Sequence, residues 1–160
     1  MTPIELLSPA RTADIGIEAV RHGADAVYVG GPGFGARAAA GNSVADIERL
    51  CRFAHPFGAK VYVTLNTILF DDELKRAEAL VKEIYEAGAD ALIVQDLAYL
   101  TMSLPPIALH ASTQTDITTP EKAALLEAAG FTRLVVAREL SLKEIGEISK
   151  TVSVPLEAFV

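Results

Sequence analysis

Short apolar segments alternate along this chain with longer segments whose apolar residues recur at helical spacing. Such alternation over short loops implies right-handed crossovers, and therefore a parallel sheet covered by helices. The expected strands are residues 4–7, 26–29, 61–65, 91–94, 107–109 and 134–136, and the expected helical segments are residues 12–22, 44–57, 72–88, 97–103, 120–129 and 142–150. Units of this length favour an α/β fold of the parallel (β/α) barrel type, as in TIM barrels, over a doubly wound sheet.

Residues typical of helix ends support these boundaries. Ser43, Asp71 and Thr119 are expected to cap the helices that follow them, and Ser141 with Glu144 forms a capping-box pattern. Glycine adopts a left-handed backbone easily and is therefore common after helices. It follows expected helix ends at Gly23, Gly58, Gly88 and Gly130.

The chain is expected to form a single (β/α) domain over residues 1–160, but a complete barrel needs about 250 residues. A seventh strand is expected at residues 155–160, where the sequence stops without a polar end or a following helix. We therefore expect an incomplete barrel, truncated at its C-terminus, from the N-terminal portion of a longer protein. An open barrel exposes unpaired strand edges, so we expect self-association through those edges.

The composition is that of a globular domain, because 51% of the residues are hydrophobic and 22% are charged. No apolar stretch reaches the roughly 18 residues of a membrane span, and the N-terminus lacks a signal-peptide pattern. A cytoplasmic location without membrane contact is therefore expected. The net charge of −7 argues against nucleic-acid binding by this segment alone. The single cysteine, Cys51, excludes an internal disulfide and a cysteine-rich metal site within these residues.

Polar residues follow the expected strands, and parallel strands bring their carboxyl ends to one side of the sheet. The stretch from Gly30 and Gly31 to Arg37 follows the second strand and lies in a connection of about 14 residues, longer than usual. Glycines let a backbone approach a phosphate or carboxylate closely, and Arg37 would complete such an anion site. The alternative is a flexible surface loop. The glycine spacing is not that of a dinucleotide-binding fingerprint.

The fifth strand ends in a cluster of polar side chains, His110, Ser112 and Gln114. Strand alternation directs His110 and Ser112 to the same side of the sheet. His110 is a candidate acid–base catalyst and Gln114 a candidate anchor for substrate. The alternative is a hydrogen-bonded histidine in the barrel wall.

The sixth strand ends in Arg138 and Glu139. Arg138 is a candidate clamp for a carboxylate or phosphate, and Glu139 a candidate base. The alternative is a local ion pair that braces the mouth of the barrel. Asn66 is a further candidate for substrate binding, and Gln95 is a weaker one. Asp96 is expected to cap the helix that follows it.

Several sequence stretches together resemble the collagenase-like peptidase family, whose mechanism is unclassified. They are Ile4 to Ala10, Gly23 to Gly31, Val61 to Asn66, His110 to Gln114 and Ala137 to Ser141, and they occur in the family's order along essentially the whole chain. In that family the strand that is Leu156 to Val160 here continues into a segment that contains cysteine, and further cysteines follow it.

The resemblance implies one of two enzyme activities for the whole protein. Members are named as proteases, yet some relatives hydroxylate transfer RNA, ribosomal RNA or quinone precursors without oxygen, and in some the cysteines hold an iron–sulfur cluster. The leading hypothesis is therefore RNA modification by hydroxylation. No cofactor is expected in this segment, a cluster would need cysteines beyond residue 160, and RNA contact would belong mainly to the missing part. The alternatives are a peptidase, for which no nucleophile or zinc motif is evident, and a non-catalytic scaffold that binds an anion or a partner.

Overall fold

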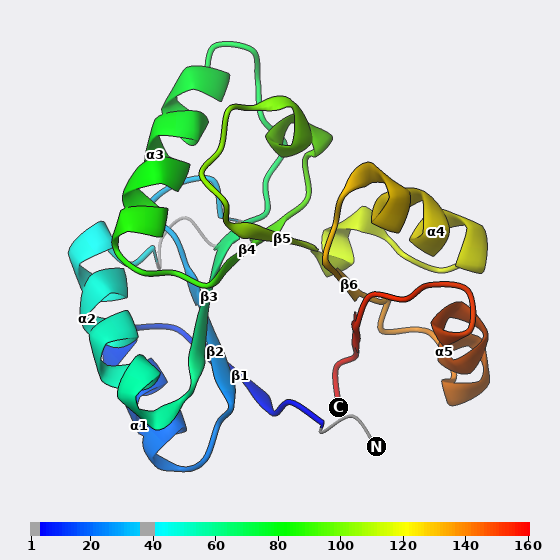
Figure 1. Cartoon of the computed structure of the whole chain (residues 1–160), viewed down its shortest axis with the longest axis horizontal. Coiled ribbons are helices and arrows are strands. Elements are labelled where there is room, and N and C mark those ends of the chain that lie inside the picture. Colours follow the sequence, from blue (N-terminus) through cyan, green and yellow to red (C-terminus); the bar gives the residue numbers. More distant parts are fainter. Residues whose placement is uncertain (1–3, 36–40) are drawn as a thin grey trace.

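The computed structural model describes residues 4–35 and 41–160, which form one curved sheet wrapped by helices (Figure 1). The sheet has seven strands in the order β1-β2-β3-β4-β5-β6-β7, and every neighbouring pair is parallel. The strands are β1 (Leu7–Ala10), β2 (Ala26–Gly30), β3 (Lys60–Leu65), β4 (Ala91–Val94), β5 (Ala108–Ala111), β6 (Arg133–Val135) and β7 (Leu156–Glu157). The predicted incomplete barrel of TIM type is thus confirmed.

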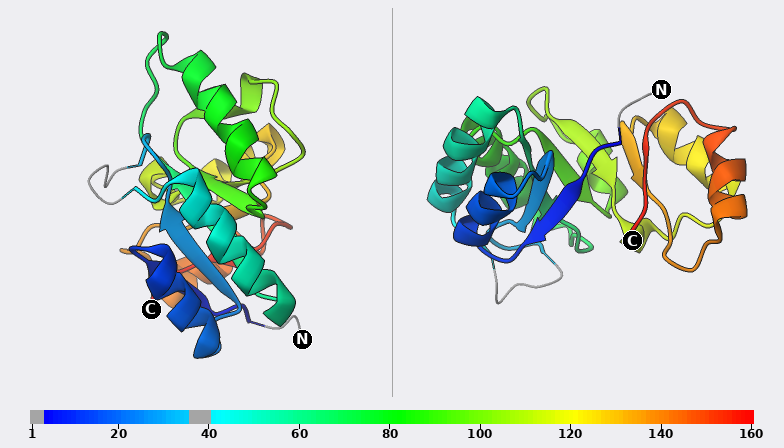
Figure 2. Two further views of the ribbon diagram at one scale, coloured as in Figure 1. Left: turned by 90° about the vertical axis from the view of Figure 1, so that its left-hand side faces the viewer. Right: turned by 90° about the horizontal axis from the view of Figure 1, so that it is seen from below.

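Helices follow the strands and lie outside the curve of the sheet, as the view from below in Figure 2 also shows. The α-helices are α1 (Ala13–Arg21), α2 (Val44–Ala54), α3 (Leu74–Glu86), α4 (Pro120–Ala129) and α5 (Leu142–Ser149). Short 3-10 helices are η2 (His55–Phe57), η3 (Leu97–Thr101) and η4 (Thr113–Thr115). Among the described residues, no helix is long and apolar enough to cross a membrane.

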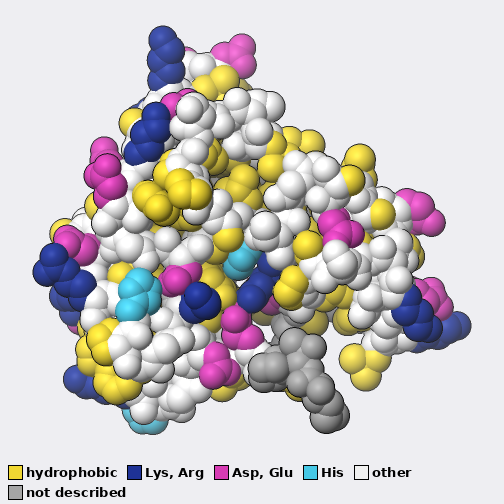
Figure 3. Space-filling model, viewed as in Figure 1, with side chains coloured by type: hydrophobic (Ala, Val, Ile, Leu, Met, Phe, Trp, Pro, Cys, Tyr) yellow, Lys and Arg dark blue, Asp and Glu magenta, His cyan; other side chains and the backbone are white. Residues whose placement is uncertain are grey.

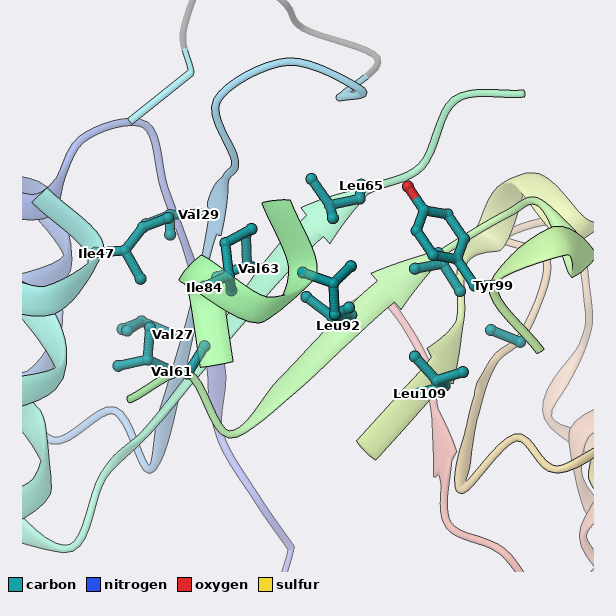
Figure 4. Packing of buried hydrophobic residues seen from close by; sticks show 14 of the residues in the cluster. Val27, Val29, Ile47, Val61, Val63, Leu65, Ile84, Leu92, Tyr99 and Leu109 are labelled. Carbon is teal, nitrogen blue, oxygen red and sulfur yellow. The ribbon is translucent and has the colours of Figure 1, made fainter. Parts of the chain in front are cut away.

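The main hydrophobic core lies between the sheet and the helices. Val27, Val63 and Leu92 point from neighbouring strands toward Ile47 of α2 and Ile84 of α3 (Figure 4). Residues at alternate strand positions face the inside of the curve, where Ala26, Tyr62, Ala91 and Ile93 form a second, smaller cluster. The period of two along each strand therefore separates a helix-facing core from a barrel interior.

The predicted first strand begins too early. β1 pairs with β2 from Leu7 onward, and Leu6 before it is exposed. Pro9 lies inside β1, although a proline has no N–H group to donate to a sheet. β1 pairs only with β2 among the described strands, and an edge strand tolerates a missing donor on its outer side. Pro9 is therefore compatible with this edge strand.

Three other boundaries differ from the prediction. The seventh strand is confined to β7, because only Leu156 and Glu157 pair with β6. The helical segment expected at residues 97–103 is the shorter 3-10 helix η3, Leu97–Thr101. Asp71 does not cap α3, whose N-cap is Glu73 without a side-chain cap hydrogen bond. The predicted caps Ser43, Thr119 and Ser141 are confirmed, as are left-handed glycines after helices at Gly23, Gly58, Gly88 and Gly130.

Asn42 joins the ends of the first two strands. It is 6% exposed and its amide oxygen accepts a hydrogen bond from the Ala13 N–H group at 3.0 Å. Its amide nitrogen donates to the carbonyl oxygens of Arg11 at 3.2 Å and Gly30 at 3.1 Å. One side chain thus satisfies three backbone groups from two loops at the same end of the sheet.

Replacement of Asn42 by alanine should lower the free energy of unfolding by about 2–3 kcal/mol, because buried backbone groups lose their partners. Urea denaturation followed by circular dichroism measures this loss. Gln114→Ala is the control, because Gln114 is an exposed amide at the same end of the barrel. An equal stability of Asn42→Ala and the control would show that Asn42 does not join the loops.

Candidate functional site

A pocket of about 760 Å³ opens at the carboxyl ends of the strands. Residues in or just after each of the seven strands border it, including Arg11 after β1, Asn66 after β3 and Arg138 after β6. Because all the strands are parallel, their carboxyl ends meet around one opening. The sheet therefore gathers residues that are distant in sequence, as the strand pattern indicated.

The predicted glycine segment lies in the wall of this pocket. Gly30 and Gly31 both border it, but the Gly31 N–H group donates to the Thr64 carbonyl oxygen at 3.2 Å. A Cβ atom on Gly31 would lie 2.7 Å from Cδ2 of Leu65, so close packing accounts for this glycine. The Gly31 amide is thus committed to the backbone and is not available to an anion. Arg37, the expected end of the anion site, lies outside the described residues.

Two predicted polar residues after β5 border the pocket, whereas His110 does not. Ser112 and Gln114 line it, and the Ser112 hydroxyl accepts a hydrogen bond from the Gln114 N–H group at 3.3 Å. His110 is 5% exposed and packs edge-on against the Tyr62 ring, with centroids 4.8 Å apart. His110 faces the barrel interior beside Tyr62 and lies two residues before Ser112, one level deeper than the pocket lining.

Arg138 reaches the pocket and Glu139 does not. The Arg138 guanidinium carbon lies 4.4 Å from the centre of the Phe159 ring, and both residues border the pocket. Glu139 is exposed and is absent from the lining. Among the described residues, Arg138 and Glu139 form no ion pair with each other, so the alternative of a local brace is not supported. The roles of Arg138 in binding and of Glu139 in catalysis remain predictions.

Asp96 has the structural role that was predicted. One carboxylate oxygen accepts from the Ala98 N–H group at 2.8 Å, which caps η3. The other accepts from the Leu69 N–H group at 2.8 Å and so fixes the loop after β3. Asn66 at the start of that loop borders the pocket, whereas Gln95 does not.

A cluster of charged and aromatic side chains fills the barrel interior below the pocket. Glu5 accepts hydrogen bonds from both terminal nitrogens of Arg133 and, at 3.1 Å, from the Tyr62 hydroxyl. Glu157 Oε2 lies 3.8 Å from Nη1 of Arg133, and His110 is next to Arg133 in the strand register. Figure 3 shows histidine, basic and acidic side chains gathered near the middle of one face of the molecule. Together, we call the following five residues the interior charge cluster: Glu5, Tyr62, His110, Arg133 and Glu157.

The surroundings shift the pKa values of this cluster in opposite directions. Hydrogen bonds from Arg133 lower the pKa of Glu5. Burial, helped by the positive charge of Arg133, lowers the pKa of His110 to about 4. Burial raises the pKa of Glu157 to about 7 despite the opposing effect of Arg133. His110 is therefore neutral near pH 7, while Glu157 titrates there.

Sequence reasoning missed most of this cluster. Glu5, Tyr62, Arg133 and Glu157 were read only as parts of strands or of their flanks. Their shared signal is a polar or charged residue at an inward position next to apolar ones, as at Glu157 between Leu156 and Ala158. Sorting each strand by facing direction would have placed Tyr62, His110 and Arg133 on one interior layer.

The described residues offer no evident site for a metal or a metal cluster. Cys51 is buried, and burial raises the pKa of its thiol to about 12, so it is not a ready thiolate ligand. Among the described residues, no three His, Cys, Asp or Glu side chains are grouped so that they could hold a metal ion. A cluster therefore does not fit the residues present here.

Comparison with known proteins identifies related sequences and folds. The profile of Peptidase family U32 matches residues 12–160. The chain is 57% identical over 157 residues to the 23S rRNA 5-hydroxycytidine C2501 synthase of Escherichia coli, covering 98% of this chain and 24% of that protein. It is 32% identical over 160 residues to tRNA hydroxylation protein P1 of Bacillus subtilis, covering 98% of this chain and 38% of that protein. The chain thus spans only a minor part of the length of these relatives.

A solved structure described as the U32 peptidase Mk0906 has the same fold. It superposes with a TM-score of 0.78 at 18% identity, covering 99% of this chain and 69% of that chain. The resemblance found in the sequence and the barrel architecture are thereby both confirmed.

The opposite pKa shifts of His110 and Glu157 predict that the stability of the protein changes little between pH 4.5 and 6.5. In this range unfolding adds a proton at His110, so its contribution to stability grows as the pH rises. Unfolding releases a proton from Glu157, so its contribution shrinks as the pH rises. Glu157→Gln removes the second effect, and stability should then rise with pH by up to about 1.4 kcal/mol per unit.

Urea denaturation at a series of pH values measures these slopes. His110→Gln is the reciprocal variant, and its stability should fall as the pH rises over the same range. Identical slopes in the two variants would contradict the assigned pKa directions.

Proposed function

We propose that this chain, which belongs to Peptidase family U32, forms part of the barrel of an enzyme that hydroxylates RNA. The observation that carries the proposal is the 57% identity over 157 residues to an enzyme named for making 5-hydroxycytidine in 23S ribosomal RNA. A second relative, 32% identical over 160 residues, is named as a tRNA hydroxylation protein. Ribosomal RNA is the substrate that we favour, because the identity to the ribosomal RNA enzyme is much higher.

The chemistry of the pocket supports a nucleotide as the ligand. A volume of about 760 Å³ accommodates one nucleotide turned out of an RNA strand. Asn66 and Gln114 bring amide groups, which hydrogen-bond to base edges, and Tyr28 and Phe159 bring aromatic rings, on which bases stack.

The remaining predicted residues have distinct places in this proposal. Arg138 provides a guanidinium for a phosphate at the pocket rim, and Gly30 and Gly31 form a wall without side chains. We assign His110 a supporting place in the interior charge cluster, since it does not border the pocket. Glu139, exposed outside the lining, would need a movement of the loop after β6 to meet the ligand.

The peptidase alternative has weaker support from the site. The Ser112 hydroxyl caps η4 by accepting from the Gln114 N–H group, and Ser112 is 2% exposed. Within residues 4–35 and 41–160, no hydrogen-bonded chain of serine, histidine and carboxylate is present, which a serine nucleophile would need for activation. The family's name is thus not matched by a peptidase site in this part of the protein.

Other parts of the full-length protein would complete the activity. An iron–sulfur cluster, if the activity uses one, would be held by cysteines outside residues 1–160, since Cys51 is the single cysteine here. Most RNA contacts would also lie outside this segment, because its net charge of −7 repels phosphates. The cytoplasm, where ribosomes and transfer RNA are found, is the proposed location.

Mass spectrometry of RNA nucleosides tests the proposed function. A strain that lacks the full-length protein should lose a hydroxylated pyrimidine, and the wild-type protein should restore it. Arg138→Ala should lower the rate of restoration roughly tenfold or more, because a charge-assisted contact to phosphate is lost. Lys143→Ala is the matched control, because Lys143 is an exposed cation on α5 away from the pocket.

Unchanged RNA hydroxylation in the deletion strain would contradict the proposal. Cleavage of gelatin by the purified protein, abolished by Ser112→Ala, would instead support the peptidase alternative.

The two edges of the sheet are a second property to be tested. β1 and β7 each pair with one strand only among the described strands, so each has an unpaired side. We propose that residues 1–160, produced alone, associate through these edges. Light scattering should then give a mass above 17.0 kDa that decreases when Leu7→Pro removes an N–H donor from the outer side of β1, since Leu6 on one side of it bonds inward to Ala26. A monomer at high concentration would rule this association out.

A further inference from the structure

Glu157 connects the pocket with the interior charge cluster. Its side chain is 13% exposed and borders the pocket, while its Oε2 atom lies 3.8 Å from Nη1 of Arg133. It therefore belongs to both layers of the barrel interior. Sequence reasoning assigned it no role.

The pairing in the cluster leaves Glu157 without a full counter-charge. Arg133 binds both oxygens of Glu5, so its positive charge is already balanced by that carboxylate. Tyr62 also donates its hydroxyl to Glu5. Among the described residues, Glu157 Oε2 is buried and has no hydrogen-bond partner. A buried carboxylate without hydrogen bonds is costly, so the neutral, protonated form is favoured.

We propose that Glu157 is the proton donor of the pocket, and that its neutral carboxyl group binds and protonates the nucleobase. This inference rests on the proposed function, because that function places an RNA base in the pocket. Oε2 is buried beside Arg133, so the other oxygen of the neutral carboxyl group is the one that presents an O–H donor to the pocket. This donor complements the ring nitrogen of cytosine, which is an acceptor.

The proposed step moves one proton from Glu157 to the base and needs no other reactant. The O–H bond of Glu157 breaks and an N–H bond forms on the ring nitrogen of the base, without any change in electron count. The resulting carboxylate lies beside Arg133, which stabilises its negative charge. The protonated base is poorer in electrons and therefore more open to addition at its ring carbons. The proton returns to Glu157 when the product leaves.

Charged groups from several strands surround Glu157 and, together with burial, set its pKa. Glu5 before β1 and Arg133 in β6 are paired, and His110 in β5 is neutral near pH 7. Arg138 borders the same pocket and adds positive charge near the rim. Burial of Glu157 outweighs the attraction of Arg133 and raises its pKa to about 7. Base binding that needs the protonated form should thus weaken above neutral pH.

Calorimetric titration of the full-length protein with cytidine 5′-monophosphate tests this directly between pH 5 and 9. Wild-type affinity should fall roughly tenfold per pH unit above pH 7, once Glu157 is ionised. Glu157→Gln keeps a donor and an acceptor but has no proton to transfer. Its affinity should lie within about threefold of the wild-type value at pH 6 and should no longer change above pH 7.

Turnover on RNA separates binding from proton donation. Glu157→Gln should lower kcat by about 100-fold or more and leave KM nearly unchanged, as expected when a general acid is removed. Glu147→Gln is the matched control, because Glu147 is exposed on α5 away from the pocket. Thermal unfolding establishes that each variant is folded. If Glu157→Gln unfolds, carboxyl-carbon NMR of the labelled wild-type protein replaces it, and a Glu157 titration near pH 7 that shifts with the nucleotide is expected.

Retained turnover in folded Glu157→Gln would overturn the inference, as would wild-type nucleotide binding that is unaffected by pH above 7. A wild-type protein that does not hydroxylate RNA would overturn the proposed function instead. In that case, pH-dependent binding of cytidine 5′-monophosphate that is lost in Glu157→Gln would still support the role of Glu157 in base binding.

Discussion

The ion pair between Glu5 and Arg133 holds the two sides of the open barrel together. Glu5 precedes the first strand and Arg133 begins the sixth, so they are 128 residues apart in the chain. Among the described strands, β1 and β7 do not pair, and this contact spans the interior where backbone pairing is absent. The pair is partly buried, so loss of one partner leaves the other charge without full compensation from solvent. This contact is thus a direct link between the start of the described chain and the sixth strand of the curved sheet.

The same ion pair organises the chemistry of the interior. The positive charge of Arg133 disfavours a proton on His110. Because Glu5 binds Arg133, the same charge does not fully compensate a carboxylate at Glu157. The Arg133 guanidinium therefore helps to keep His110 neutral, whereas burial raises the pKa of Glu157 against the attraction of the same guanidinium. Glu157 lies where the interior charge cluster meets the lining of the pocket. This division agrees with the general rule that barrel interiors are packed in layers below a functional mouth.

The strand–helix alternation was sufficient to predict the fold. The spacing of apolar residues, every second residue in strands and every third or fourth in helices, indicates directly which face of each element is buried. The pocket followed from the same argument, and Asn66, Gln114 and Arg138 border it as expected. The interior charge cluster did not follow, because His110 and Arg133 meet Glu5 only when distant strands curl into one wall. Pro9 is a second case in which the local sequence does not show how the strands assemble. Its meaning depends on whether the strand lies at an edge, which is a property of the assembled sheet.

The three side-chain hydrogen bonds of Asn42 connect the loop after β1 to the loop after β2 at the mouth of the barrel. One amide nitrogen donates to carbonyl groups of both Arg11 and Gly30, which belong to opposite sides of the β1–β2 corner. Because both carbonyl groups share the Asn42 amide nitrogen as donor, a displacement of one of them strains the hydrogen bond to the other. A ligand that displaced the backbone at Gly30 would therefore also strain the hydrogen bond between Asn42 and Arg11, so this side chain couples the two loops at the pocket rim.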